Sequence, residues 1–367
     1  MFKTLIQKLK DNPRTIVFTE GTDARILEAS SRLLAGTFLK PILVGNEAEV
    51  RAAAEEAGYN INGAEIIDPK NYDRMDEMVA QMVELRKGKM TEEQCHEALS
   101  HGNYFGTMLV KMGVADCLLG GATYSTADTV RPALQLIKTK PGNKIVSSCF
   151  ILVRPAATGD NEVLAMGDCA INIKPSEDDL VEIALETAQC AKIFGIDPKI
   201  AFLSYSTLGS GKGEDVDKMR NACAKAKAAN PDLAIDGELQ FDAAVSPRVA
   251  QTKCPDSKVA GHANTFIFPD INAGNIGYKN CPASWWIRCL RPDPSWSECT
   301  DQRSVQRMQR TGSILHGYHH SCFKLIVSYF ILKQKIFLQN FLKQNISNCL
   351  FVLLQQAVAF MLLEVSI

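Results

Sequence analysis

Short apolar runs alternate with amphipathic helical patterns over the first 279 residues of this 367-residue chain. The runs at 15–18 and 41–45 have the length and composition of buried strands, and helical spacing follows at 23–35 and 47–57. Strands that alternate with helices in this way are typical of a mostly parallel sheet with helices on both faces. The pattern therefore predicts an α/β protein of doubly wound architecture.

A polar segment at 138–144, which contains a Pro-Gly pair, predicts a boundary between two domains. Beyond it, the apolar runs 145–152 and 163–166 predict an antiparallel pair of strands. Ser176, followed by three acidic residues, predicts the start of a long helix. We expect one α/β domain over 1–144 and a second over 145–279.

The composition changes abruptly near residue 280. Residues 1–280 carry 31 Lys and Arg and 37 Asp and Glu, a net charge of −6, whereas residues 281–367 carry nine and four, a net charge of +5. All three tryptophans and five of the twelve cysteines lie after 280. The strand and helix periodicities end there too, so the last quarter of the chain does not continue the α/β pattern.

Two interpretations of the segment 322–367 stay open. One is a membrane segment, although the longest apolar stretch, 349–365, is broken by Gln355, Gln356 and Glu364 and is shorter than the ~20 residues that a span requires. The other is that this stretch is not selected protein sequence, because AT-rich codons specify the Phe, Ile, Leu, Lys and Asn that dominate it.

The overall charge is balanced, with 40 basic and 41 acidic side chains, which does not favour a nucleic-acid partner. The first ten residues lack the apolar core and the cleavage site of a signal peptide. The seven cysteines before 280 have no metal-binding spacing and are predicted to be buried as small apolar residues. We expect a cytoplasmic protein that binds small molecules and no metal.

The segment 200–213 predicts a strand, then a loop rich in Gly, Ser and Lys, then a helix that begins at Glu214. The backbone N–H groups of such a loop, together with Lys212 and the helix N-terminus, favour an anion. The loop is not a Walker A sequence, because Gly213 follows the lysine where that motif has Ser or Thr. A tight strand-to-helix turn without a ligand is the alternative.

A second loop of this kind lies at 120–131. Hydroxyl side chains, among them Ser125 and Thr126, stand at its helix start, and Arg131 follows one turn later. A guanidinium binds phosphate in a two-pronged geometry that lysine cannot match. A solvated surface arginine is the alternative for Arg131, and a helix C-terminal charge is the alternative for Arg86.

Two further polar segments follow apolar runs. The segment 236–242 places three acidic residues at a strand end, where open parallel sheets bind ligands, and these acids suit a base, a metal site or helix caps. The segment 266–279 leads into a turn with Asp270, Asn272 and Asn275, which favours the wall of a binding site over a core position.

Five segments, in this order along the chain, resemble the phosphate acetyltransferase (phosphotransacetylase) family: LVGN (43–46), TVRPA (129–133), LSYST (203–207), DGELQFDAA (236–244) and FPDINAGN (268–275). The resemblance extends from the N-terminus to Lys279. It implies the reversible reaction of acetyl-CoA and phosphate to acetyl phosphate and CoA, with coenzyme A as a substrate and no bound cofactor.

The resemblance also implies two α/β domains with the active site in a cleft between them, a fold similar to that of isocitrate and isopropylmalate dehydrogenases, and a homodimer. It gives Arg86 and Arg131 a role in substrate binding. Butyryl-transferring relatives share the fold, so the acyl preference stays open. We expect the polar side chains of the loops to complete the substrate site: Ser125, Thr126, Ser204, Ser206, Thr207, Lys212, Asp270, Asn272 and Asn275.

The chain departs from the family after Lys279. The family pattern continues to a string NDLSRGC, which supplies a catalytic serine and arginine, with an acidic base beyond it, and none of these is present. Back-translation from Asn280, read one base later, restores this string in register; Trp285 and Trp286, each with the single codon TGG, become two glycines. We interpret 280–367 as a frameshifted, non-native tail and expect the chain as written to have no catalytic residues.

Three hypotheses follow. The chain is an active phosphate acetyltransferase whose recorded sequence contains an error near codon 280, or it is a frameshifted product that folds in part and is inactive. The third hypothesis is a membrane-tethered binding protein with a genuine apolar tail.

Overall fold

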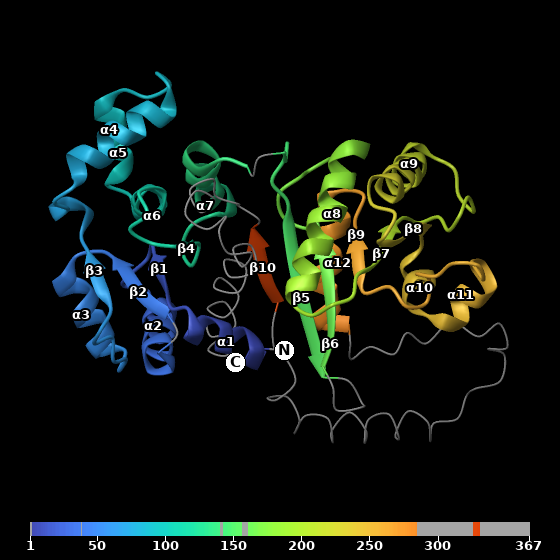
Figure 1. Ribbon diagram of the computed structural model, residues 1–367, viewed down its shortest axis with the longest axis horizontal. Coiled ribbons are helices and arrows are strands. Elements are labelled where there is room, and N and C mark those ends of the chain that lie inside the picture. Colours follow the sequence, from blue (N-terminus) through green and yellow to red (C-terminus); the bar gives the residue numbers. More distant parts are fainter. Residues whose placement is uncertain (1, 38, 140–141, 156–160, 285–325, 331–367) are drawn as a thin grey trace, which may run out of the picture.

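The computed structural model describes residues 2–37, 39–139, 142–155, 161–284 and 326–330. Within them, two β-sheets lie side by side along the long axis of the molecule, each flanked by helices (Figure 1). The sheet near the N-terminus is drawn in blue and cyan, and the other in green to orange.

The first sheet has four parallel strands in the order β3-β2-β1-β4. The strands are β1 (Arg14–Phe18), β2 (Leu39–Val44), β3 (Glu65–Ile67) and β4 (Cys117–Leu119). Parallel neighbours need crossover connections, which helices provide. These are α2 (Ala24–Gly36), α3 (Glu47–Glu56), α4 (Met75–Arg86), α5 (Glu92–Leu99) and α6 (Gly102–Lys111), preceded by α1 (Phe2–Asp11) and with the short η1 (Pro69–Asn71) before α4.

Alternation of side chains along β1 explains why helices cover both faces of this sheet. Ile16 and Phe18 belong to a buried cluster with Leu27 of α2, whereas Val17 belongs to a cluster with Met82 of α4 and Phe105 of α6. After β4 the chain enters α7 (Thr126–Pro132) and η2 (Ala133–Ile137).

The second sheet has the order β10-β5-β6-β9-β7-β8. Strands β6, β9, β7 and β8 are parallel, while β5 is antiparallel to β6. Strand β10 pairs antiparallel with the outer edge of β5. The strands are β5 (Ser148–Pro155), β6 (Asn161–Gly167), β7 (Lys199–Leu203), β8 (Ala234–Leu239), β9 (Thr265–Ile267) and β10 (Ile326–Phe330).

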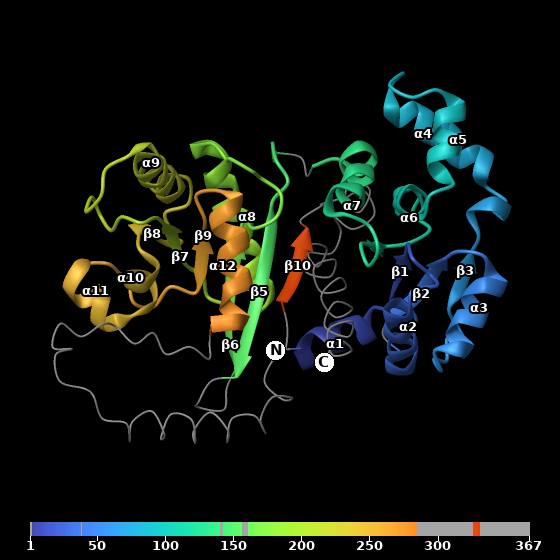
Figure 2. The same ribbon diagram turned by 180° about the vertical axis from the view of Figure 1, so that it is seen from behind.

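Helices also cover both faces of the second sheet. Ile200 and Phe202 of β7 pack with α8 (Glu177–Ile193) and α9 (Glu214–Ala229), and Ala201 and Leu203 pack with α10 (Phe241–Val245) and α11 (Pro247–Lys253). Helix α12 (Ile271–Ser284) lies on the face opposite α8, as a comparison of Figure 1 with the reverse view in Figure 2 makes plain.

The predicted α/β class with parallel sheets is confirmed, and so is the antiparallel pair that opens the second half of the chain. Helix α8 begins as predicted, because Ser176 and Asp179 form a reciprocal capping box at its N-terminus. All strands of the first sheet precede residue 120 and those of the second follow residue 147, on either side of the predicted boundary at 138–144. The domain limits themselves stay a prediction.

Most of the predicted frameshifted tail, 280–367, lies outside the described residues. Two parts of it are described: the end of α12, which runs five residues beyond Lys279 to Ser284, and β10. In the part of the chain that the structure describes, no helix is long and apolar enough to cross a bilayer.

Candidate active site

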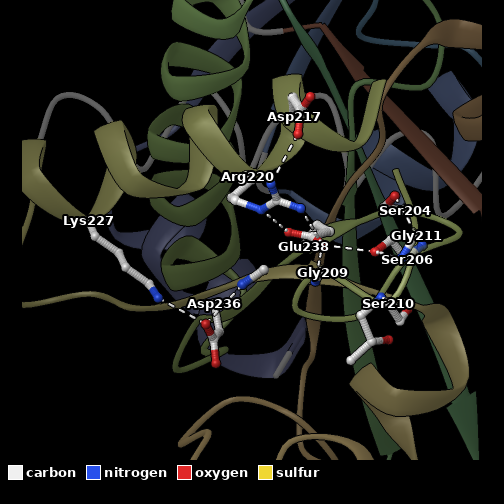
Figure 3. A network of polar contacts seen from close by, with 12 residues as sticks. Ser204, Ser206, Gly209, Ser210, Gly211, Asp217, Arg220, Lys227, Asp236 and Glu238 are labelled. Carbon is white, nitrogen blue, oxygen red and sulfur yellow. Dashed lines mark hydrogen bonds and ion pairs between the residues drawn. The ribbon is translucent and has the colours of Figure 1, made fainter. Parts of the chain in front are cut away.

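The loop that follows β7, residues 204–213, folds around a carboxylate from the neighbouring strand β8 (Figure 3). Glu238 is fully buried, and its Oε1 accepts hydrogen bonds from the Ser206 hydroxyl at 2.9 Å and the Gly209 amide at 2.7 Å. Its Oε2 accepts from Nε of Arg220 on α9 at 3.1 Å. The carboxylate therefore ties the loop to both β8 and α9.

The pKa of Glu238 depends on two opposing effects, burial and hydrogen bonding. Burial alone raises the pKa, but the hydrogen bonds from Arg220, Gly209 and Ser206 oppose burial, and the pKa lies below its ordinary value. Glu238 is thus an anion in the folded protein at neutral pH. It supplies a fixed negative charge beneath a loop that we had expected to bind an anion through its amides.

Most amides of this loop form hydrogen bonds within the protein. The Leu208 amide donates to the Glu238 carbonyl at 3.0 Å, and the Gly211 amide donates to the Ser206 hydroxyl at 2.9 Å. Internal acceptors also take the amides of Ser204, Ser206, Thr207, Gly209 and Ser210. The six consecutive amides from Ser206 to Gly211 are therefore bonded within the protein, and the prediction that the loop binds an anion stays a prediction.

The four predicted residues of this loop differ in how far they are buried. Ser206 and Thr207 are buried, and the Thr207 hydroxyl donates to Oε1 of Gln240 at 3.2 Å, so both hydroxyls face inward. Ser204 is half-buried and its hydroxyl accepts from the Ser206 amide. Lys212 is exposed. Of these four predicted residues, Lys212 alone projects a fully exposed side chain.

The exposed surface of the loop is apolar as well as basic. Tyr205 is 64% exposed and Leu208 is 51% exposed. Leu208 adopts a left-handed backbone with φ of 47°, which a branched side chain rarely does and which the surrounding hydrogen bonds enforce. The Tyr205 hydroxyl donates to the Lys212 carbonyl at 2.8 Å, which fixes the ring in place although it is exposed.

The loop after β4 is built in a similar way around Glu20, which follows β1. Its carboxylate accepts from the amides of Gly121 at 3.1 Å and Thr123 at 2.6 Å and from the Thr123 hydroxyl at 3.0 Å. Arg25 donates to the Ala122 carbonyl at 2.8 Å. The loop that leads into α7 is thereby held from two sides.

The predicted residues of this second loop lie at both ends of α7: Ser125 and Thr126 at its start and Arg131 in its last turn. Ser125 is its N-cap: the Ser125 hydroxyl accepts from the Asp128 amide and donates to the Asp128 carboxylate. Thr126 is the first residue of the helix. Arg131, which is 55% exposed, forms an ion pair with Asp128 at 3.1 Å. A phosphate at Arg131 would have to share it with that carboxylate.

Arg86 is the last residue of α4 and is half-buried. Its Nε contacts Sδ of Met90 at 3.3 Å, and no ion pair of Arg86 occurs among the described residues. Arg86 therefore occupies a helix C-terminus, and in the described part of the chain its guanidinium has no carboxylate partner.

The predicted residues of the turn after β9 mainly serve the start of α12. Asp270 accepts from the Ala273 amide at 2.9 Å, and Asn275 donates to the Cys169 carbonyl at 3.2 Å. Asn272 is exposed. Gly274 touches the Asp168 carbonyl so closely that a side chain would not fit there. These contacts dock α12 on the turn that follows β6.

The structure groups the predicted residues by sheet. Those of 204–212 and 270–275 follow the adjacent parallel strands β7 and β9, and Lys218 of α9 donates to the Pro269 carbonyl at 3.0 Å, which links the two segments. Ser125 caps α7, Thr126 and Arg131 lie within α7, and Arg86 ends α4, all in the half of the chain that forms the first sheet. Among the described residues, no hydrogen bond or ion pair joins these two groups.

The anchoring residues Glu20, Arg220 and Glu238 were missed as functional residues. The sequence places the acids of 236–242 at a strand end, where they suit a base, a metal site or helix caps. Asp236 is paired with Lys227 at 2.9 Å and Asp242 with Lys253 at 3.2 Å. Within the described residues, no group of His, Cys, Asp and Glu is arranged to hold a metal.

The seven cysteines before 280 are all buried, as predicted: Cys95, Cys117, Cys149, Cys169, Cys190, Cys223 and Cys254. Burial raises the pKa of the Cys223 thiol to about 12. Such a thiol is protonated at neutral pH and is a poor nucleophile.

Comparison with known proteins agrees with the motifs. The chain is 51% identical over 279 residues to a phosphate acetyltransferase of Bacillus subtilis, a match that covers 76% of this chain and 85% of the relative. It is 46% identical over 283 residues to a phosphate acetyltransferase of Staphylococcus aureus, with the same coverage of both chains. A phosphotransacetylase crystal structure from Streptococcus pyogenes matches with a TM-score of 0.71 and 50% identity, over 77% of this chain and 86% of that chain.

The family model described as phosphate acetyl/butaryl transferase matches residues 1–283. The match includes both sheets apart from β10, and both anchored loops. On this evidence the chain belongs to the phosphate acetyl/butyryl transferase family.

Proposed function

We propose that residues 1–283 are the substrate-binding part of a phosphate acetyltransferase, which converts acetyl-CoA and phosphate to acetyl phosphate and CoA in a reversible reaction. The observation that carries this proposal is the 51% identity to a phosphate acetyltransferase over 279 residues. We propose acetyl rather than butyryl as the acyl group, because the relatives at 46–51% identity are named for acetyl transfer.

The chemistry needs anion-binding groups for phosphate and for the phosphates of CoA. Arg86 and Arg131, with Ser125 and Thr126 at the start of α7, are the proposed phosphate-binding group. Arg86 supports this role because its guanidinium has no carboxylate partner in the described part of the chain. Lys212 is the proposed cation for a phosphate of CoA.

Acyl transfer also needs a base for the CoA thiol and donors for the oxyanion of the tetrahedral intermediate. The resemblance to the family assigns these roles to a serine, an arginine and an acidic residue, which would follow residue 283. The family match ends at residue 283, and 15% of the Bacillus subtilis relative is left unmatched, since 85% is covered. We propose that this missing part is encoded one base out of frame and that the chain as written does not turn over.

The test compares two chains: this one, and one in which the codons from Asn280 onward are read one base later. Formation of acetyl-CoA from acetyl phosphate and CoA is measured for both. We expect turnover in the frame-restored chain. In the chain as written, the rate of acetyl-CoA formation should be lower by several orders of magnitude, because the base, the oxyanion donor and the groups that position the nucleophile are all missing. Equal turnover would overturn the proposed frameshift, and no turnover in the restored chain would overturn the proposed function.

Substitution of Arg131 by Ala in the restored chain tests the proposed phosphate-binding group. We expect a higher KM for phosphate and a smaller effect on the KM for CoA, because a guanidinium binds a phosphate dianion directly.

We further propose a cytoplasmic homodimer with the active site in a cleft between two domains. Analytical ultracentrifugation of the restored chain tests the dimer.

A further inference from the structure

We propose that the outer edge of β5 is an acceptor site that captures an extended, uncharged segment of chain by strand addition, and that residues 326–330 of the tail are its occupant in this chain. The tail segment thus completes the second sheet, although we interpret the tail as frameshifted. The inference concerns the chain as written and does not depend on acetyl transfer.

Strand β5 lacks the features by which proteins protect a sheet edge. It is eight residues long, and Ser148 to Val153 include neither a charged residue nor a proline. Its pairing with β6 runs from Cys149 to Pro155 in unbroken register. A long, regular, uncharged edge presents a row of N–H and C=O groups to which another strand can be added.

The other three sheet edges among the described residues are each protected. Strands β3 and β4, at the two ends of the first sheet, are only three residues long. Strand β8, at the far end of the second sheet, carries Asp236 and Glu238 on either side of Gly237, and its register with β7 shifts next to them. Short strands, charges and irregular register all oppose strand addition. Strand β5 is the exception among the described edges.

Helices cover both faces of β5 and leave its edge as the place where a partner can bind. Cys149 and Ile151 belong to a buried cluster with Cys190 of α8. On the other face, the Phe150 ring stacks on the Tyr278 ring of α12, with 4.1 Å between the ring centroids. The groups of β5 that remain for a partner are those of its backbone, which recognise an extended main chain.

The tail segment 326–330 has the composition that such an edge accepts. Its sequence is Ile-Val-Ser-Tyr-Phe, in which every residue except the serine is β-branched or aromatic and none is charged. It pairs antiparallel with β5, from Ile326 opposite Leu152 to Phe330 opposite Ser148. Figure 1 and the reverse view in Figure 2 both show β10 on the side of β5 that faces the first sheet.

Strand addition also explains how a segment that was not selected for this role can occupy the edge. The affinity in this mode of binding comes from main-chain hydrogen bonds, which every residue except proline can form. The side chains need only favour an extended backbone and carry no charge. The segment 326–330 meets both conditions.

Ser328→Pro tests the pairing, because it removes an amide from the centre of β10 and a proline ring is not tolerated inside a paired strand. Ser347→Pro, elsewhere in the tail, is the matched control. Hydrogen exchange is measured on the full chain. We expect the β5 amides that point away from β6 to exchange about tenfold faster in Ser328→Pro than in wild type or Ser347→Pro.

The amides shared between β6 and β9 serve as an internal control in the same measurement. Their exchange should be unchanged in Ser328→Pro, because these strands do not touch β10. Equal exchange of the β5 amides in all three chains would overturn the inference.

Tyr329→Cys tests the register without removing a backbone amide, so the inference stays testable if Ser328→Pro does not fold. Residue 329 lies opposite Cys149. Directly opposite residues of antiparallel strands have Cα atoms roughly 4.5–5.5 Å apart, a separation that a disulfide bond spans. Val327→Cys, opposite Ile151, is the matched control on the same face of β10.

Both cysteine variants are oxidised with diamide, which takes up the two protons and two electrons that a pair of thiols loses on forming a disulfide bond. Peptide mass spectrometry then identifies the bonded pair. We expect Tyr329→Cys to form a bond to Cys149 about tenfold more than Val327→Cys does, because disulfide geometry is specific. Equal cross-linking of Cys149 in the two variants would overturn the inference.

The mass of the cross-linked product shows which chain supplies the strand. A product with the mass of one chain supports the inference, because the tail segment then pairs with β5 of its own chain. A product with the mass of two chains would assign the edge to a second copy and would overturn it. None of these measurements involves a substrate, so the proposed function stands or fails separately.

Discussion

The two anchored loops, one in each sheet, use the same device with different electrostatics. Glu20 holds the loop after β4 through neutral donors, namely the amides of Gly121 and Thr123 and the Thr123 hydroxyl. Glu238 holds the loop after β7 through neutral donors and the guanidinium of Arg220. A buried carboxylate at the carboxyl end of a strand can thus organise a loop with or without a hydrogen-bonded guanidinium.

The loops also differ in what they expose. The Glu20 loop leads into a short helix whose basic residue, Arg131, is already paired with Asp128. The Glu238 loop exposes Tyr205 and Lys212. The first loop therefore leads to a basic residue with a carboxylate partner, whereas the second exposes an aromatic ring and a lysine. The four predictions below test this comparison.

The largest stability effect is expected at Glu238. Glu238→Gln places an amide N–H₂ against at least one of its donors and leaves Arg220 without its buried partner, which should lower the free energy of unfolding by roughly 2–4 kcal/mol. Arg220 is 44% exposed and can be hydrated, so the loss should stay below that of a fully buried pair. Urea denaturation measures it, and a change under 0.5 kcal/mol would show that the carboxylate is not an anchor.

Glu20→Gln should cost less, about 1–2 kcal/mol, because within the described residues no guanidinium forms a hydrogen bond or ion pair with Glu20, and a glutamine oxygen still accepts the Thr123 donors. The same urea experiment compares the two variants directly. A larger loss at Glu20 than at Glu238 would reverse the comparison and would mean that the Arg220 pair contributes little.

Acid should weaken the Glu238 anchor. The pKa of Glu238 is lower in the folded chain than its ordinary value of 4.5, so its stabilisation is complete above that pH and is lost as the pH falls below it through the lowered folded pKa. Asp236 behaves in the same way, because the hydrogen bonds from Ser257 and Lys227 outweigh the effect of burial on its pKa. Thermal melts between pH 7 and pH 3 should therefore show the gap between wild type and Glu238→Gln closing on acidification.

The smallest effect is expected at Asp128. Asp128→Asn keeps an acceptor for the Ser125 hydroxyl but removes the charge paired with Arg131, so phosphate should bind about twice as tightly, in line with the modest strength of exposed ion pairs. Titration of inorganic phosphate into the full chain measures this. Weaker binding in Asp128→Asn would indicate that Asp128 orients Arg131 rather than competing for it.

Much of the fold follows from local patterns. The alternation of apolar runs and helical spacing predicted β1, β2, α2 and α3 to within a few residues, because side-chain periodicity is a property of the strand or helix itself. Ser176 predicted the start of α8 for the same reason, since a capping box needs only residues three apart.

The candidate site was predicted less well, because its contacts join distant residues. Ser206 and Thr207 look like ligand hydroxyls in the sequence, yet Glu238 and Gln240, 32 and 33 residues later, turn both inward. The glycine-rich stretch predicted amides that bind an anion, which stays a prediction; the amides from Ser206 to Gly211 are bonded internally, and Gly211 accommodates the Tyr205 ring. Nothing within the loop itself specifies the partners Glu238 and Gln240.

The sequence by itself determined the family, the α/β alternation and the break near residue 280, because each of these is written in local strings, periodicity and composition. Tertiary structure alone decided which polar groups of the loops remain available to a ligand. The reason is that a hydrogen bond formed inside the protein removes its donor from solvent, and the acceptor that does so, Glu20 or Glu238, lies on another strand of the sheet.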